Sequence, residues 1–348
     1  MSSSTNQRLT SIHPIWAVEG GRVTIHGSDF PIDQLQLPEV KIGDIAARAV
    51  FASRSTISVL VPSGLDGGRT TVRVEGVAGE TAFLEVGSTL ATGLHQVDNP
   101  VFDRDGNLYV TYSGSRGQEV PVSIFRVTPN GRRESFVSGI VNPTSMTFDP
   151  AGNLYVSSRF EGSVYRVKPD GTNETFATDL GIACGLAFGR DGTLYVGDRS
   201  GTLFSVKPDG RATNIATLPS SVAAFHLAVG SDDAVYVTAP TLGPYDYVYR
   251  VDPRRGTVER MYSGFGRPQG LAFDSQGALY VIEALAGWSG LYRLRAEGKP
   301  ELVLAGQRLV GVAFDPTGGL VVSSNETAYR LHVAIRPLSS QNSETSAS

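Results

Sequence analysis

The sequence predicts an all-β protein in which a small β-sandwich precedes a six-bladed β-propeller. Three observations predict this. A motif of apolar strand, glycine turn and Leu-Tyr-Val or a close variant of it recurs six times in the C-terminal two-thirds of the chain. The N-terminal part lacks the motif and alternates apolar with polar residues. The chain of 348 residues also contains 40 glycines and 19 prolines, as expected of a protein that turns often.

The repeat is the strongest of these signals, because regular self-similarity identifies repeat architectures. Successive copies begin 40 to 46 residues apart, which leaves room for about four short strands per unit and no long helix. The copies begin at Phe102, Phe148, Phe188, Val229, Phe273 and Phe314. Such units bury their apolar faces against each other, so we expect a ring of blades.

Further strands follow Leu-Tyr-Val in each copy. Ile124–Val127 and Val164–Val167 are examples of a third strand, and turns such as Pro169-Asp-Gly171 follow it. Proline fixes φ and glycine supplies the left-handed position in such turns. A fourth strand closes each unit, as in Glu134–Gly139.

The last copy shows no clear fourth strand of its own. The segment Ser88–Gly93, just before the first copy, resembles the fourth strand at Glu174–Asp179. We therefore predict that residues 88–93 pair into the last blade and close the ring, which would remove two open sheet edges.

Domain boundaries follow from the same patterns. Residues 9–86 alternate as in a small sandwich. The propeller is expected over 87–335, a flexible N-terminus over 1–8 and a disordered tail rich in Ser, Asn and Thr over 336–348.

Composition excludes several classes of function. Lys and Arg total 30 against 34 Asp and Glu, so no basic surface for nucleic acid is expected. The single cysteine, Cys184, excludes an intramolecular disulfide and a cysteine-based metal site. No apolar run would span a membrane and no signal peptide is seen, so the expected location is cytoplasmic, although a secreted protein without its leader would look the same.

The first domain resembles the IPT/TIG family, an immunoglobulin-like fold. The residues that carry this are Glu19–Phe30, Val40–Gly43, Ile57–Gly64 and Gly67–Val74. The resemblance implies a fold and not a function, because this family serves DNA-binding factors, receptors and carbohydrate enzymes alike.

The propeller is similar to the NHL-repeat and gluconolactonase/regucalcin-like group, as in Gly270–Asp274 and Asp191–Asp198. In the gluconolactonase-like enzymes a divalent metal lies at the mouth of the channel, and Asp98 matches a metal-binding carboxylate of that family. The equivalent positions of the six copies are Asp98, Thr144, Cys184, Phe225, Gln269 and Val310. A hard cation needs more oxygen ligands than this set offers. The alternative is that Asp98 is a turn residue at the channel rim.

A second ring of candidates lies two residues after each Leu-Tyr-Val. Asp198 and Glu283 belong to it, and Arg159 and Arg199 stand beside it. Converging carboxylates could supply an acid and a base. The alternative is that these residues tether neighbouring turns.

His226 is the only histidine on a predicted inner strand. It could act as a base in the channel or be a structural histidine. Cys184 faces the channel, but a nucleophilic thiolate needs a base or cation nearby, and an inert buried thiol is the alternative.

Three functions are consistent with these features. The first is a binding protein whose funnel accepts a small polar molecule or a peptide, with the TIG module positioning it or contacting a partner. The second is a hydrolase of lactones or esters that uses a divalent cation (Ca²⁺, Zn²⁺ or Mn²⁺) held by Asp98. The third is a scaffold. The predicted funnel residues are Asp98, Arg159, Asp198, Arg199, His226, Gln269 and Glu283.

Overall fold

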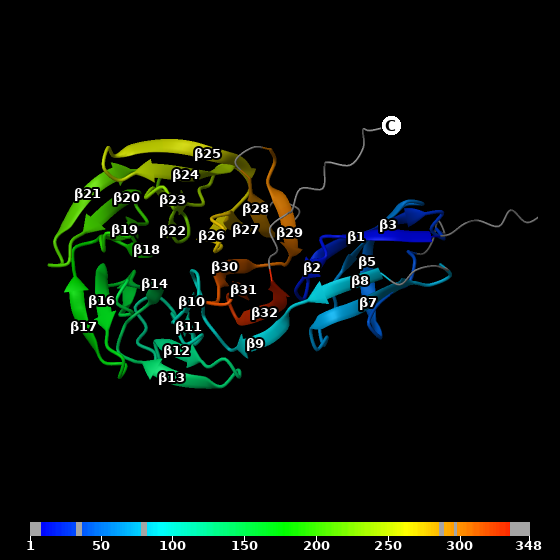
Figure 1. The fold of residues 1–348 in the computed structure, drawn as a ribbon, viewed down its shortest axis with the longest axis horizontal. Coiled ribbons are helices and arrows are strands. Elements are labelled where there is room, and N and C mark those ends of the chain that lie inside the picture. The colour runs from blue at the N-terminus through cyan, green and yellow to red at the C-terminus, as the bar shows by residue number, and fades with distance from the viewer. Residues whose placement is uncertain (1–7, 33–36, 78–81, 285–288, 296–297, 335–348) are drawn as a thin grey trace, which may run out of the picture.

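The computed structural model describes residues 8–32, 37–77, 82–284, 289–295 and 298–334, and every regular element in these ranges is a β-strand (Figure 1). Across these ranges, no helix is long and apolar enough to cross a membrane. The all-β prediction is confirmed. The predicted disordered tail and all but the last residue of the predicted flexible N-terminus lie outside the described residues.

The N-terminal domain is a small sandwich. Its strands are β1 (Arg8–His13), β2 (Trp16–Ala17), β3 (Arg22–Ser28), β4 (Val40–Ile42), β5 (Ile45–Ala52), β6 (Thr56–Leu60), β7 (Gly68–Val74) and β8 (Ala82–Val86). β5 pairs with both β4 and β6, so it joins the two halves. Alternate side chains such as Ile25, Ile42, Ile57 and Leu84 point inward and form one fully buried core.

The C-terminal part is a ring of six four-stranded repeats (Figure 1). Repeat one comprises β10 (Val101–Phe102), β11 (Leu108–Thr111), β12 (Ile124–Val127) and β13 (Arg133–Val137), and repeat two β14 (Pro143–Phe148), β15 (Leu154–Ser158), β16 (Ser163–Val167) and β17 (Asn173–Ala177). Repeat three comprises β18 (Ala183–Phe188), β19 (Leu194–Asp198), β20 (Thr202–Val206) and β21 (Ala212–Thr217), and repeat four β22 (His226–Val229), β23 (Val235–Thr238), β24 (Asp246–Asp252) and β25 (Thr257–Phe265). Repeat five comprises β26 (Pro268–Phe273), β27 (Leu279–Glu283), β28 (Gly290–Leu294) and β29 (Glu301–Ala305), and repeat six β30 (Leu309–Phe314), β31 (Gly319–Ser324), β32 (Thr327–Ala334) and β9 (Ser88–Thr92).

Only five of these repeats are separate four-stranded sheets, so the structure has five separate blades where the sequence predicted six. Repeat five keeps the order of the others, but its outer strand β29 pairs in parallel with β2. β2 also pairs in parallel with β8. Repeat five and the N-terminal domain therefore share one 12-stranded sheet. The edge of β29 would otherwise present unpaired backbone N–H and C=O groups, and β2 supplies hydrogen-bond partners for them.

The predicted closure of the ring is confirmed. β9 pairs antiparallel with β32, from Ser88 opposite Arg330 to Thr92 opposite Thr327. In Figure 1, β9 lies alongside β32, where the chain enters the ring. The last repeat thus takes its outer strand from the segment that precedes the first.

The tyrosine of Leu-Tyr-Val packs between neighbouring repeats. Tyr155 of repeat two meets Phe188 of repeat three edge to face, with ring centroids 4.9 Å apart. The same contact joins repeats one to two, four to five and five to six, at 5.1 to 5.4 Å. Each such pair contributes about 0.5–1.5 kcal/mol beyond its buried area.

Candidate functional site

The central channel has two distinct ends. In each repeat the inner strand begins beside the end of the second strand, as in the pairings Pro143–Ser158 and Ala183–Asp198. We call this end the upper mouth. The inner strands end at the opposite, lower mouth, where phenylalanines from five repeats and Val229 from the fourth line a cavity of about 380 Å³.

The segment 96–100 enters the channel from repeat one. Asn99 donates from Nδ2 to the carbonyl of Leu271 (2.8 Å) and accepts at Oδ1 from the amide of Val312 (2.9 Å). Repeats five and six each have a glycine, Gly270 and Gly311, where they contact Asn99. A Cβ on Gly270 would lie 2.1 Å from Asn99 Oδ1, and one on Gly311 would lie 2.9 Å from Asn99 Cα. These glycines are required because a channel segment occupies their side-chain space.

Asp98 extends from this segment to repeat four. Its Oδ1 lies 2.5 Å from His226 Nδ1, and both side chains are almost fully buried. Asp98 Oδ1 also accepts from the Asn99 amide (2.7 Å), while Gln96 Nε2 donates to the Asp98 carbonyl (2.6 Å). A carboxylate that accepts from Nδ1–H of a neutral imidazole leaves Nε2 as a hydrogen-bond acceptor.

The other ring nitrogen, His226 Nε2, is buried and has no hydrogen-bond partner among the described residues. Leaving a buried polar atom unpaired costs about 1–3 kcal/mol. Such an atom needs an explanation, and a bound water or ligand group is one. His226 is therefore oriented by Asp98 and has one nitrogen available for chemistry or binding.

Arginines surround the upper mouth. Arg159 is half-buried in repeat two, and its side chain makes no hydrogen bond or ion pair with any described residue. Burial lowers the pKa of Arg159, and the charges of Arg199 and Arg116 lower it further. Burial and the Arg159 charge also lower the pKa of His95. The charges of three arginines thus act on one another at this end of the channel.

Cys184 lies below these arginines. The thiol is buried, and desolvation raises its pKa to about 11, with the Asp98 charge also raising it. The nearby Arg159 and Arg199 lower this pKa, but by less. The thiol is therefore neutral near neutral pH, as in the alternative of an inert cysteine.

Asp198 and Glu283 lie at the upper mouth, where their carboxylates accept hydrogen bonds from nearby groups of the protein. Asp198 Oδ1 accepts from the amide of Ile182 (2.8 Å), and its Oδ2 accepts from the hydroxyl of Ser200. Glu283 accepts from the amides of Gly266 (2.6 Å) and Arg267 (3.0 Å). Both carboxylates tether the turn that leads into their own inner strand. These bonds agree with the alternative that the two residues tether turns, and an acid–base pair stays a prediction.

Arg199 and Gln269 are also placed at this end. The Arg199 side chain donates from Nε to the Ser221 carbonyl (3.2 Å) and from Nη2 to the Val222 carbonyl (2.9 Å), which fixes its position. Gln269 is buried, and its carbonyl accepts from Thr238 Oγ1 (2.6 Å). Of the seven predicted funnel residues, the structure brings Asp98 and His226 into direct contact and sets Arg159 and Arg199 above Cys184.

The residues present do not fit a hard divalent cation. Asp98 Oδ1 is occupied by His226 and the Asn99 amide, and Phe225 and Val310 at equivalent positions offer no oxygen. Within the described ranges there is no group of three or more His, Cys, Asp or Glu side chains that could hold a metal. The bound cation stays a prediction, and no chemistry is assigned to it.

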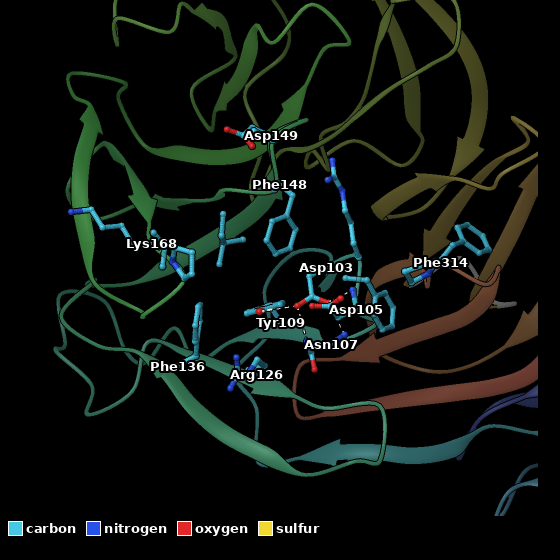
Figure 2. Close-up of a pocket in the computed structure, with 18 residues that line it drawn as sticks. Asp103, Asp105, Asn107, Tyr109, Arg126, Phe136, Phe148, Asp149, Lys168 and Phe314 are labelled. Atoms are coloured by element: carbon cyan, nitrogen blue, oxygen red, sulfur yellow. Dashed lines mark hydrogen bonds between the residues drawn. The ribbon is translucent and has the colours of Figure 1, made fainter.

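A larger cavity, of about 660 Å³, opens at the lower side of repeats one and two (Figure 2). Figure 2 shows Asp103 turned toward Asn107 and Tyr109, and the hydrogen bonds are 2.8 and 3.0 Å long. Arg126 pairs with Glu134 (2.7 Å). Since the polar groups at its centre are already satisfied within the fold, this cavity is a weaker candidate than the upper mouth.

Sequence reasoning found the members of the site but missed its central contact. Asp98 and His226 are 128 residues apart, and only ring geometry brings repeat one to repeat four. Gln96 and Asn99 were also missed as channel residues. The signal for Asn99 was the pair of glycines, Gly270 and Gly311, at matching positions of two inner strands.

Comparison with known proteins supports the fold assignments. The family model for the IPT/TIG domain matches residues 8–88. A search of curated proteins found no matching sequence. The NHL-repeat assignment of the propeller and the exact domain boundaries stay predictions.

Solved structures share the propeller fold at low identity. A provisionally assigned gluconolactonase is 18% identical, with a TM-score of 0.56 over 70% of this chain and 90% of its own. An inactive variant of virginiamycin B lyase from Staphylococcus aureus, bound to quinupristin, is 14% identical, with a TM-score of 0.52 over 85% and 100%. An auxiliary nutrient binding protein from Bacteroides ovatus is 14% identical, with a TM-score of 0.51 over 92% and 97%. At these identities the likenesses show the propeller fold alone and no particular activity.

Proposed function

We propose that the protein is a ligand-binding β-propeller whose upper mouth takes a small polar molecule or a peptide. The observation that carries this is a set of ionisable side chains from four repeats: Arg159 and Arg199 lie at the upper mouth, and the Asp98–His226 pair lies inside the channel, where Asp98 also lines the inner part of the lower cavity. It includes a buried His226 Nε2 without a partner among the described residues. Burying such groups is costly, so proteins keep them mainly where they contact something.

Each part of the proposed site has its own role in binding. Asp98 fixes the ring orientation of His226 through Nδ1 and leaves Nε2 for a ligand group. Arg159, whose side chain has no hydrogen-bond partner among the described residues, supplies donors at the upper mouth, and Arg199, held by two carbonyls, supplies a fixed charge. The TIG domain, joined to repeat five through β2, positions the propeller or contacts a partner.

Ligand screening tests this proposal. The melting temperature of the full chain is measured against a panel of lactones, sugars, sugar acids and short peptides. We expect at least one compound to raise it, and His226→Gln to remove the shift. Arg190→Gln, an exposed arginine beside a cavity at the lower side of repeats three and four, serves as the control and should keep the shift. The proposal is wrong if no compound binds, or if His226→Gln binds the hit as the wild type does.

A second candidate, a hydrolase of lactones or esters, is favoured by the 2.5 Å contact between Asp98 and His226. An oriented imidazole can act as a general base and contribute about 10²–10⁴-fold to a rate. Hydrolysis of gluconolactone is measured with and without Ca²⁺, Zn²⁺ or Mn²⁺. The enzyme candidate predicts a rate that falls at least about 100-fold in His226→Gln. A rate at the uncatalysed level, with every ion, eliminates it.

A further inference from the structure

We propose that the ligand of the upper mouth is an organic carboxylate: its acid group meets Arg159, and its apolar part lies on Phe160 and Ile182. This inference rests on the proposed function and names the chemistry of its ligand.

The fold fixes the backbone positions of the arginines at the upper mouth. Arg159 and Arg199 occupy the same place in repeats two and three, directly after the second strand. Asn142 holds the loop that carries Arg116, by accepting at Oδ1 from the Gly117 amide (2.6 Å) and donating to the Ser115 carbonyl (2.8 Å). The Arg159 amide in turn donates to the Asn142 carbonyl (3.4 Å). Three adjacent repeats therefore each place one arginine at this mouth.

These arginines form no ion pair with the carboxylates of the described residues. The side chains of Arg159 and Arg116 form no ion pair with any described residue, and Arg199 binds carbonyls only. The neighbouring Glu161 accepts from the hydroxyl of Tyr165 (2.8 Å) on its own repeat. An incoming carboxylate would relieve the repulsion among the guanidinium groups and could accept two parallel hydrogen bonds from one of them.

An apolar rim adjoins the charge. Phe160, next to Arg159, is 52% exposed, and Ile182, whose carbonyl accepts from the Arg199 amide, is 39% exposed. Leu242 and Tyr245 of repeat four lie at the same end and are also exposed. Exposed apolar groups beside unpaired cations fit an amphipathic anion. A bare phosphate would use the arginines and leave this rim uncovered.

Calorimetric titration of the full chain with octanoate, acetate, octanamide and inorganic phosphate tests the proposal. We expect octanoate to bind at least about tenfold more tightly than acetate or phosphate, because its chain buries apolar area. Octanamide, which lacks the charge, should bind at least about tenfold more weakly than octanoate.

Variants then assign the two halves of the site. Arg159→Gln should weaken octanoate binding about tenfold or more, while Phe160→Ser should weaken octanoate binding and leave acetate binding unchanged. Arg190→Gln should bind octanoate as the wild type does. Melting temperatures within a few degrees of wild type confirm that the variants fold.

The outcomes separate the two proposals. Suppose that a neutral lactone or sugar binds the wild type but not His226→Gln, and that octanoate does not bind. This result overturns the carboxylate inference and keeps the binding function. Phosphate that binds as tightly as octanoate, or octanoate binding unaffected by Phe160→Ser, also overturns it. If no compound of any class binds, both fall.

Discussion

Asn99 links three repeats through one side chain. The side-chain amide of Asn99 makes one hydrogen bond to the backbone of repeat five and one to the backbone of repeat six. In Asn99→Ala these groups lose their partners, so we expect the free energy of unfolding to fall by about 2 kcal/mol. Gly270→Ala should act in the same direction, because its Cβ would meet Asn99 Oδ1. Urea denaturation measures both, and wild-type stability in both variants would contradict the role of Asn99.

Cys184 provides a pH test. Its folded pKa of about 11 lies above the ordinary thiol value of 9.0, so folding favours the neutral thiol. The stability that this contributes is complete below about pH 9 and is lost as the pH rises through 11. We expect a thiol reagent at pH 8 to label the protein only after denaturation. Rapid labelling of the native protein at pH 8 would show a low-pKa or accessible thiol instead.

The sequence predicted which individual residues line the channel better than it predicted which of them touch. Asp98 and His226 could each be identified because the repeat placed both near the channel. Their contact could not be predicted, since it depends on how far the segment 96–100 crosses the channel. Asp198 and Glu283 were expected to face a ligand, but local backbone amides, invisible in the residue pattern, satisfy both carboxylates.

The contacts between repeats explain why Leu-Tyr-Val recurs. The tyrosine touches the inner-strand phenylalanine of the next repeat, so the two halves of the motif are complementary across repeats. Repeat three lacks this pair because the next repeat has Val229 in place of phenylalanine, and repeat six lacks it because Val321 stands in place of the tyrosine. Periodicity predicted these strands because each is short and locally encoded.

A matched pair of variants tests this contact. Tyr155 packs on both Phe176 and Phe188, whereas Tyr195 has no phenylalanine in the next repeat. Both tyrosines are similarly buried. Tyr155→Leu should therefore destabilise the protein by about 1 kcal/mol more than Tyr195→Leu. Equal losses in thermal or urea unfolding would show that the aromatic pairs add nothing beyond burial.

The whole molecule is joined by two segments that connect distant parts of the chain. β9 closes the ring, and β2 links the N-terminal domain to repeat five. The closing strand was predictable from its likeness to other outer strands. The β2 link was not, because a strand of two residues carries no readable pattern.

This junction predicts cooperative unfolding. The Val18 amide donates to the Ala305 carbonyl (2.9 Å), and a Cβ on Gly21 would lie 2.3 Å from the same oxygen. Calorimetry of the wild type should show one transition. Gly21→Ala should disturb the junction and split or broaden this transition. Two separate transitions in the wild type would mean that the domains unfold independently.

The most direct test of the binding function is a crystal structure of the full chain with a compound that raises its melting temperature. We predict ligand density at the upper mouth, within hydrogen-bond distance of Arg159 or His226. Density confined to the cavity of Figure 2, or to the phenylalanines of the lower mouth and out of contact with Asp98, Arg159 and His226, would contradict it.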